Sequence, residues 1–201
     1  MAFINLFPSV ILSDILHDIS DENIKDWKSF IKNSEVINEG ENGFFSQNQR
    51  LLEDVIFEKL KHHILRLSRL YLNELSHDFE DVQISSSWAN ILTNNTKIHL
   101  HQHSNAYICG AFYLDDCSRS PIQFHSPLLD KWKFTAITHP NPNHIRKQTN
   151  FNIFPKSKSM IIFPSWLSHD VPKSLNTERI TIAFNIIPKG EFGPNTQKLY
   201  L

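Results

Sequence analysis

Hydrophobic residues recur at helical spacing near the start of the chain. Ser20 is a residue type that caps helices, and the acidic Asp21 and Glu22 that follow it suit a first helical turn. Apolar side chains then recur every three or four positions, at Ile24, Trp27, Phe30 and Ile31. The pattern predicts a short amphipathic helix that begins just after Ser20.

A longer apolar stripe follows the polar turn at residues 38–43. Its members are again three or four positions apart: Leu52, Ile56, Leu60, Ile64, Leu67, Tyr71 and Leu75. This predicts a long helix over about residues 48–76. Packing of the stripe against a sheet is favoured over a coiled coil, but if the chain self-associates we expect a homodimer through these N-terminal helices.

The pattern changes after residue 80 to short runs rich in β-branched and aromatic residues. Seven such runs occupy residues 82–92, 97–103, 107–114, 121–126, 133–138, 160–165 and 179–188. Their number and short spacing predict an antiparallel sandwich or barrel, with a polar loop over residues 139–158. We therefore expect one α+β domain over residues 1–201, with a mainly helical part at 1–80 and a jelly-roll core at 81–190.

Composition and charge narrow the class of protein. The 201 residues are 40% hydrophobic, with 15 Phe and 4 Trp, which excludes disorder for most of the chain. The formal net charge of −1 gives no reason to expect a nucleic-acid partner. Without an apolar run of membrane-spanning length or a signal peptide, we expect a soluble cytoplasmic protein with no membrane partner. Cys109 and Cys117 lack metal-knuckle spacing, so we expect two reduced thiols.

Histidine is the residue type that points to chemistry. Three of the 11 histidines, His99, His101 and His103, alternate along one predicted strand, so their side chains project from one face. Two imidazoles on one face are able to share a metal ion, although a solvated strand face would account for this run equally well.

A second segment favours the metal hypothesis. His169 follows a hydrophobic strand and a turn, and Arg179 opens the next strand ten residues later. A metal ligand beside a permanently charged, bidentate carboxylate receptor is what an iron-chelating dicarboxylate requires. The alternative is a turn histidine and an Arg179 that pairs with Glu178 at the surface.

Five segments together resemble one family. They are H-x-H at 101–103, SNAYICGAFYL at 104–114, PIQFHSP at 121–127, FPSWLSHDVP at 163–172 and RITIAFN at 179–185. Over residues 84–187 the chain resembles the 2-oxoglutarate- and Fe(II)-dependent oxygenases of bacteria and marine phages, with Ser104 in place of a Pro and Cys109 in place of a Ser. The resemblance implies a double-stranded β-helix, Fe(II) and 2-oxoglutarate as cofactors and, for a phage-encoded protein, a location in the host cytoplasm.

The resemblance also implies roles for individual residues. His101 and His169 would bind the metal, and His103 would stand where better-known oxygenases have Asp or Glu. Arg179 would hold the C5 carboxylate of 2-oxoglutarate. Thr181 and Tyr113 are further candidates for that carboxylate and Asn90 for the C1 end, while the alternatives for the third metal ligand are Asp115, Asp116, Asp130 and Asp170.

The implied activity is a dioxygenase that uses molecular oxygen to hydroxylate an unidentified small-molecule or peptide substrate, with release of succinate and CO2. One alternative is a cupin-like enzyme with a three-histidine metal site and no 2-oxoglutarate. Another is a non-catalytic jelly-roll module, such as a binding or virion-associated protein. Arg179, ten residues after His169, argues against the cupin-like alternative.

Overall fold

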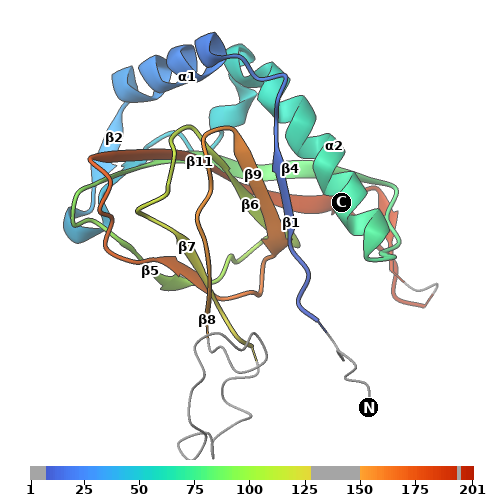
Figure 1. Ribbon diagram of the computed structural model, residues 1–201. Helices are drawn as coiled ribbons and strands as arrows, with labels where there is room; N and C mark the ends of the chain where they lie inside the picture. The colour runs from blue at the N-terminus through green and yellow to red at the C-terminus, as the bar shows by residue number, and fades with distance from the viewer. Residues whose placement is uncertain (1–7, 128–149, 194–195) are drawn as a thin grey trace, which may run out of the picture.

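Two antiparallel sheets form the body of the protein (Figure 1). The computed structural model describes residues 8–127, 150–193 and 196–201. Within these ranges, no helix is long and apolar enough to cross a membrane. The architecture is mostly antiparallel sheet with few helices, which is consistent with a jelly roll.

The larger sheet contains seven strands. Their order is β1 (Leu12–Ile15), β9 (Ser159–Pro164), β6 (Ile108–Tyr113), β11 (Glu178–Lys189), β4 (Asp81–Thr93), β3 (Phe44–Ser46) and β2 (Val36–Asn38). The smaller sheet has the order β5 (Ile98–His101), β10 (His169–Val171), β7 (Ile122–His125) and β8 (Asn150–Ile153). A short ladder of β12 (Glu191–Phe192) and β13 (Leu199–Tyr200) lies near the C-terminus.

The central strand β11 divides its side chains between two environments. Ile180, Ile182 and Phe184 are fully buried in the core that the larger sheet shares with the helices. Arg179 and Thr181 point to the other face, into a cavity that also contains residues of the smaller sheet. The alternation in β11 therefore separates the structural core from the candidate site.

The first helix, α1 (Asp21–Asn33), has the predicted start. The Ser20 side chain accepts a hydrogen bond from the backbone of Asn23, and the Asn23 side chain accepts one from the backbone of Ser20. This reciprocal capping satisfies N–H groups at a helix start that have no partner within the helix.

The second helix, α2 (Glu58–Glu74), starts later than predicted. The apolar spacing from residue 48 passes through two 3-10 turns, η2 (Leu51–Glu53) and η3 (Val55–Phe57), which follow η1 (Gly40–Asn42). Asp54 separates the two turns with an extended backbone (φ −68°, ψ 134°), and its side chain accepts a hydrogen bond from Ile56 N. The predicted boundary at residue 48 is wrong because Asp54 interrupts the helix.

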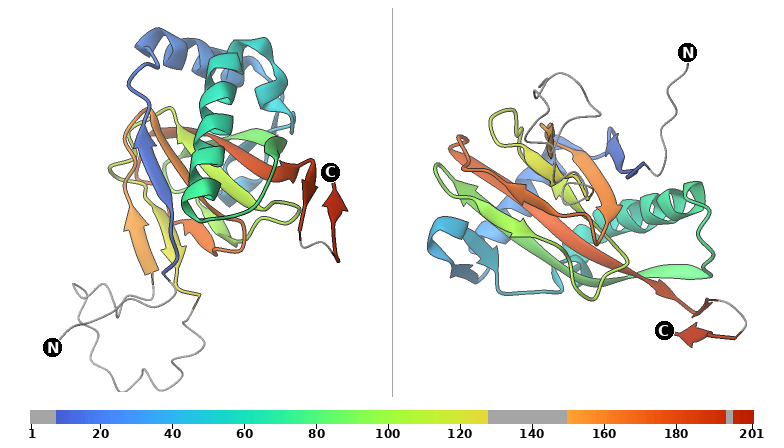
Figure 2. Two further views of the ribbon diagram at one scale, coloured as in Figure 1. Left: turned by 90° about the vertical axis from the view of Figure 1, so that its right-hand side faces the viewer. Right: turned by 90° about the horizontal axis from the view of Figure 1, so that it is seen from below.

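Both helices contribute to the core beside the larger sheet (Figure 2, left). Trp27 of α1 lies edge-on to Phe112 of β6, with ring centroids 5.9 Å apart. The α2 stripe is buried in the same cluster through Leu60, Ile64, Leu67 and Tyr71. Because these side chains are buried within the chain, the stripe is not available for a coiled coil.

One loop prediction needs correction, and one strand prediction is untested. The segment 1–80 is mainly helical among its described residues, although it also contains β1, β2 and β3. The segment expected to be a loop over 139–158 contains β8, which pairs with β7. The predicted strand run at 133–138 lies outside the described residues.

Candidate active site

Three histidines from two segments of the smaller sheet converge. His101 ends β5, His169 begins β10, and these two residues are directly paired across the strands. His103 follows two residues after β5 and is held by a backbone hydrogen bond from its N–H to Ser165 O, 3.0 Å. One potential ligand atom from each imidazole lies within 4.8 Å of the other two. The strand pairing thus brings together residues that are distant in sequence.

The hydrogen bonds of the three rings define which nitrogen is free. His101 Nδ1 lies 2.7 Å from His99 O, and His169 Nδ1 lies 2.9 Å from Leu167 O. His103 Nδ1 lies 2.6 Å from Asn185 Oδ1. Because these oxygens only accept hydrogen bonds, each Nδ1 carries the hydrogen and each Nε2 keeps a lone pair. Three lone pairs are therefore available for a metal ion.

Burial favours the neutral form of two of these rings, His103 and His169. Burial, reinforced by the neighbouring His101, lowers the pKa of His169 to about 3. Burial also lowers the pKa of His103, although its hydrogen bond to Asn185 acts in the opposite direction. Both rings are accordingly neutral at pH 7, the form in which imidazole binds metals.

Aromatic side chains surround the histidines. Trp88 stacks on His103 with centroids 5.7 Å apart and an interplanar angle of 27°. Phe163 lies edge-on to His169 at 4.6 Å, and Phe124 lies 6.0 Å from the same ring. This apolar wall limits the access of water to one side of the cluster.

The same cavity contains a buried cation. Arg179 is 2% exposed, and its guanidinium carbon lies 5.3 Å from the centre of the Tyr113 ring. Within the described part of the chain, no acidic side chain pairs with Arg179, and neither its Nε nor the Tyr113 hydroxyl has a hydrogen-bond partner. The hypothesis that Glu178 pairs with Arg179 is wrong, because Glu178 pairs with Lys32 at 2.8 Å. Unpaired buried donors of this kind suit an anionic ligand.

Two further candidates lie beside Arg179. Thr181 Oγ1 accepts a hydrogen bond from Asn90 Nδ2 at 3.4 Å, and Asn90 Oδ1 accepts one from Trp88 Nε1 at 2.9 Å. All three side chains line the cavity that also holds Arg179, Tyr113 and the histidine cluster. The residues proposed for 2-oxoglutarate and those proposed for iron thus share one cavity.

The aspartates considered as alternative ligands have other partners. Asp115 accepts a hydrogen bond from Ile180 N at 2.9 Å and forms an ion pair with Lys28. Asp116 accepts a hydrogen bond from Ser118 N, and Asp170 pairs with His125 at 3.0 Å. Asp130 lies outside the described residues. The three-histidine group contains no aspartate from the part of the chain that the structure covers.

Sequence reasoning missed two residues of this site, Trp88 and Asn185. Asn185 lies at even spacing from Arg179 in β11, so the alternation of the strand was a signal for its direction. Trp88 is likewise two residues from Asn90 in β4. Neither residue type by itself indicates a metal site. Both cysteines, Cys109 and Cys117, are buried free thiols, as predicted.

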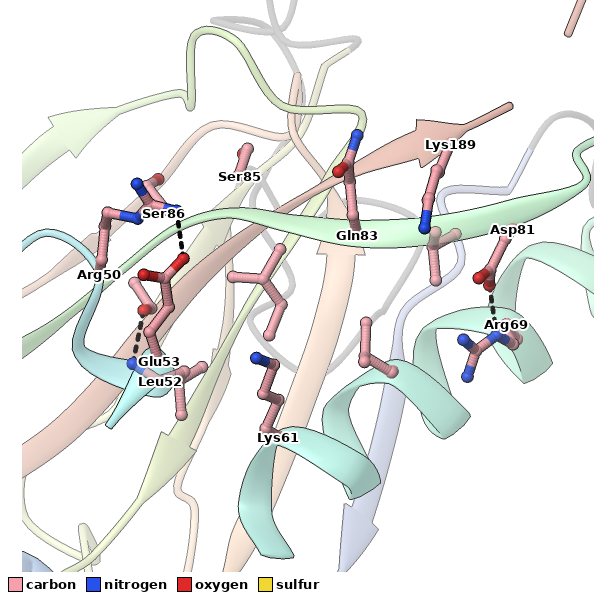
Figure 3. A pocket seen from close by; sticks show the side chains of 14 residues that line it. Arg50, Leu52, Glu53, Lys61, Arg69, Asp81, Gln83, Ser85, Ser86 and Lys189 are labelled. Carbon is pink, nitrogen blue, oxygen red and sulfur yellow. Dashed lines mark hydrogen bonds and ion pairs between the residues drawn. The ribbon is translucent and has the colours of Figure 1, made fainter. Parts of the chain in front are cut away.

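A second cavity, of about 260 Å³, lies between α2 and the first half of β4 (Figure 3). Its charged residues include two ion pairs, Arg50 with Glu53 and Arg69 with Asp81. The lining contains no histidine or cysteine among the described residues. Among the described residues, this lining therefore offers no group of metal-binding side chains like that of the histidine cavity.

Comparisons with known proteins agree with this geometry. Residues 86–185 match the family model described as "Putative 2OG-Fe(II) oxygenase". No curated protein matches the chain. Among solved structures, HygX from Streptomyces hygroscopicus with nickel and 2-oxoglutarate bound is similar at 13% identity, covering 90% of this chain and 83% of that one, with a TM-score of 0.62.

Two more solved structures have the same fold. The non-heme alpha ketoglutarate dependent epimerase SnoN from nogalamycin biosynthesis is 11% identical, with 92% and 82% of the two chains covered and a TM-score of 0.65. A Pseudomonas putida prolyl-4-hydroxylase is 11% identical, with 90% and 94% covered and a TM-score of 0.60. At these identities the likeness establishes the fold only.

The cofactors of this family fit the residues present. Fe(II) binds to neutral imidazole nitrogens, of which the cluster offers three, and the distal carboxylate of 2-oxoglutarate pairs with a cation, which Arg179 offers. The family match over residues 86–185 agrees with the shared fold and with this donor set: this part of the chain is a 2OG-Fe(II) oxygenase domain.

Proposed function

We propose that this protein is a 2-oxoglutarate- and Fe(II)-dependent dioxygenase that hydroxylates a small-molecule or peptide substrate and releases succinate and CO2. One observation carries the proposal. A single cavity contains three convergent imidazole nitrogens and a buried arginine whose Nε has no partner among the described residues. Molecular oxygen is the expected co-substrate.

His101, His103 and His169 are the proposed metal ligands. Three protein ligands leave coordination positions free for a co-substrate and oxygen. When bound, Fe(II) and 2-oxoglutarate supply the oxidising chemistry, and the chain supplies binding and orientation. Histidine in place of a carboxylate leaves the charge of the metal uncompensated by its protein ligands, which favours anionic co-substrates.

Arg179, Thr181 and Tyr113 are the proposed residues for the C5 carboxylate. A guanidinium with 2% exposure is costly to bury without an anion, and a carboxylate is able to accept two parallel hydrogen bonds from it. We propose that the buried Tyr113 hydroxyl, which has no hydrogen-bond partner among the described residues, donates another. We propose Asn90 for the C1 end. Asn90 lies on β4, directly opposite Thr181 of β11.

The surrounding side chains are proposed to keep the reaction dry. Trp88 and Phe163 cover the rings of His103 and His169. Excluding water strengthens the electrostatic contacts within the cavity and protects reactive species from side reactions.

The N-terminal helices are proposed to support the larger sheet behind this cavity. Trp27 and Phe112 connect α1 to β6, and Leu60 and Ile64 place α2 in the same cluster. A homodimer through these helices stays a prediction.

Metal analysis combined with a turnover assay tests the proposed function. We expect purified protein reconstituted anaerobically to bind one Fe(II) and, once oxygen is admitted in the presence of ascorbate as the reductant, to convert 2-oxoglutarate to succinate without substrate, measured by NMR. Iron binding without any effect of 2-oxoglutarate would instead support the cupin-like alternative. A protein that binds no metal, or only zinc, would support the non-catalytic module.

A further inference from the structure

Asn185 is not a proposed ligand, but its side chain contacts one of the three histidines of the proposed metal site. It lies in β11 with 8% of its surface exposed, directly opposite Ser86 of β4. Its Oδ1 accepts a hydrogen bond from His103 Nδ1 at 2.6 Å, and its Nδ2 donates one to Ser86 Oγ at 2.9 Å. In this arrangement the amide oxygen of Asn185 faces the imidazole and the amide nitrogen faces Ser86.

Among the three histidines, His103 alone has a side chain as the hydrogen-bond partner of its Nδ1. The Nδ1 atoms of His101 and His169 donate to the backbone carbonyls of His99 and Leu167, two residues before them. His103 follows β5 rather than lying in a strand, and its Nδ1 partner comes from a side chain 82 residues away. The larger sheet thereby determines the orientation of a ligand carried by a different segment.

We propose that Asn185 is a positioning residue that holds His103 in the Nδ1–H tautomer with Nε2 directed at the metal. The inference rests on the proposed metal site. Without an acceptor at Nδ1, neutral imidazole is free to place its hydrogen on Nε2, where it would block the metal. The stacked ring of Trp88 restrains the plane of His103, but it offers no acceptor for Nδ1.

Three variants separate positioning from packing. Asn185→Leu keeps approximate size and removes the acceptor. Asn185→Asp keeps an acceptor and adds negative charge, which increases ligand basicity in the manner of the carboxylate–histidine–metal arrangement. Asn152→Leu is the matched control. Asn152 is an exposed residue of β8, and its amide contacts Gln123 of β7 and none of the three histidines.

The first measurement is the affinity for Co(II), an air-stable probe for Fe(II), by calorimetry. Loss of an outer hydrogen-bond partner typically weakens metal binding about 10- to 100-fold, and we expect a change of this size for Asn185→Leu. Asn185→Asp should bind at least as tightly as wild type, and Asn152→Leu should be unchanged. Wild-type affinity in a folded Asn185→Leu protein would overturn the inference, as would equal losses in the Leu and Asp variants.

A second measurement uses the unmodified chain, so it remains decisive if Asn185→Leu does not fold. Paramagnetic NMR of the Co(II) protein should show shifted, slowly exchanging imidazole N–H signals from His103, bonded to Asn185, and from the buried His169. A His103 N–H that exchanges rapidly with solvent would contradict the role of Asn185. If the wild-type chain binds no Co(II), the proposed function itself fails, whereas tight binding with an unprotected His103 N–H rejects Asn185 alone.

Discussion

His103 Nε2 and His169 Nε2 lie 3.3 Å apart, and the other nitrogen of each ring is hydrogen-bonded to an oxygen. Two lone pairs at this distance repel each other unless a cation lies between them. His101, whose ring centroid is 4.3 Å from that of His169, adds a third donor on the same side. The cluster is thus arranged for a metal ion rather than for internal hydrogen bonding.

Removal of one proposed ligand should abolish stoichiometric metal binding. We expect His101→Ala and His169→Ala each to lose more than about 100-fold in Fe(II) affinity, beyond the loss typical of outer partners. His99→Ala is the control, because the exposed ring of His99 lies outside the cluster and its carbonyl is retained. Anaerobic calorimetry checks this, and an unchanged affinity would show that the altered residue is not a ligand.

His103 admits a more specific test. His103→Asp introduces the carboxylate of the commoner iron triad and should retain Fe(II), whereas His103→Ala should weaken binding as strongly as His101→Ala. The same anaerobic titration measures both. Full affinity in the alanine variant would mean that another residue supplies the third ligand.

Tyr113→Phe should weaken 2-oxoglutarate binding without lowering the stability of the protein. The buried hydroxyl has no partner among the described residues, so its removal should leave the free energy of unfolding of the cofactor-free protein unchanged or raised. Loss of its hydrogen bond to a carboxylate should weaken 2-oxoglutarate binding by about 10- to 100-fold, which corresponds to about 1.5–3 kcal/mol. Tyr107→Phe, outside the cavity, is the control. Unchanged 2-oxoglutarate affinity would remove Tyr113 from the proposed site.

Trp27 tests the support that α1 gives to the sheet. Its ring is 1% exposed, contacts Phe112, and donates a hydrogen bond from Nε1 to Ile56 O at 2.8 Å. Trp27→Ala should lower the free energy of unfolding by about 3–5 kcal/mol in urea titrations, whereas the exposed Ser29→Ala should have little effect. A loss below about 1 kcal/mol would mean that α1 contributes little to the core.

Local signals in the sequence predicted the elements that depend on local interactions. Ser20 and the periodic residues after it predicted α1, because capping and amphipathicity act within a few turns. The start of α2 was wrong because Leu52 and Ile56 continue the helical spacing through 3-10 turns that also bury apolar side chains. The capping role of Asp54 in this segment is evident only in three dimensions.

Short strands escaped prediction because distant partners define them. β1 has four residues, too few for a visible alternation, and its pairing with β9 is what makes it a strand. β10 has three residues and is recognised by pairing with β5 and β7.

The candidate site was partly visible because some residue types are informative. The alternating histidines had a bland explanation on their own, but together with His169 and Arg179 they indicated a metal site beside a carboxylate receptor. Asn185 and Trp88 are ordinary residues whose relation to His103 exists only once β4 and β11 are paired beside the cluster. The tautomers of the histidines likewise follow from tertiary hydrogen bonds.

The most direct test of the central claim is anaerobic difference spectroscopy of the Fe(II)-loaded protein during titration with 2-oxoglutarate. Bidentate chelation should produce a visible charge-transfer band in the wild type. Arg179→Gln removes a charged, bidentate contact worth about 2–5 kcal/mol, so this variant should keep Fe(II) and bind 2-oxoglutarate about thirtyfold to several thousandfold more weakly. We expect its band to be absent at sub-millimolar 2-oxoglutarate. No band in the wild type, or an equal band and affinity in Arg179→Gln, would contradict the account.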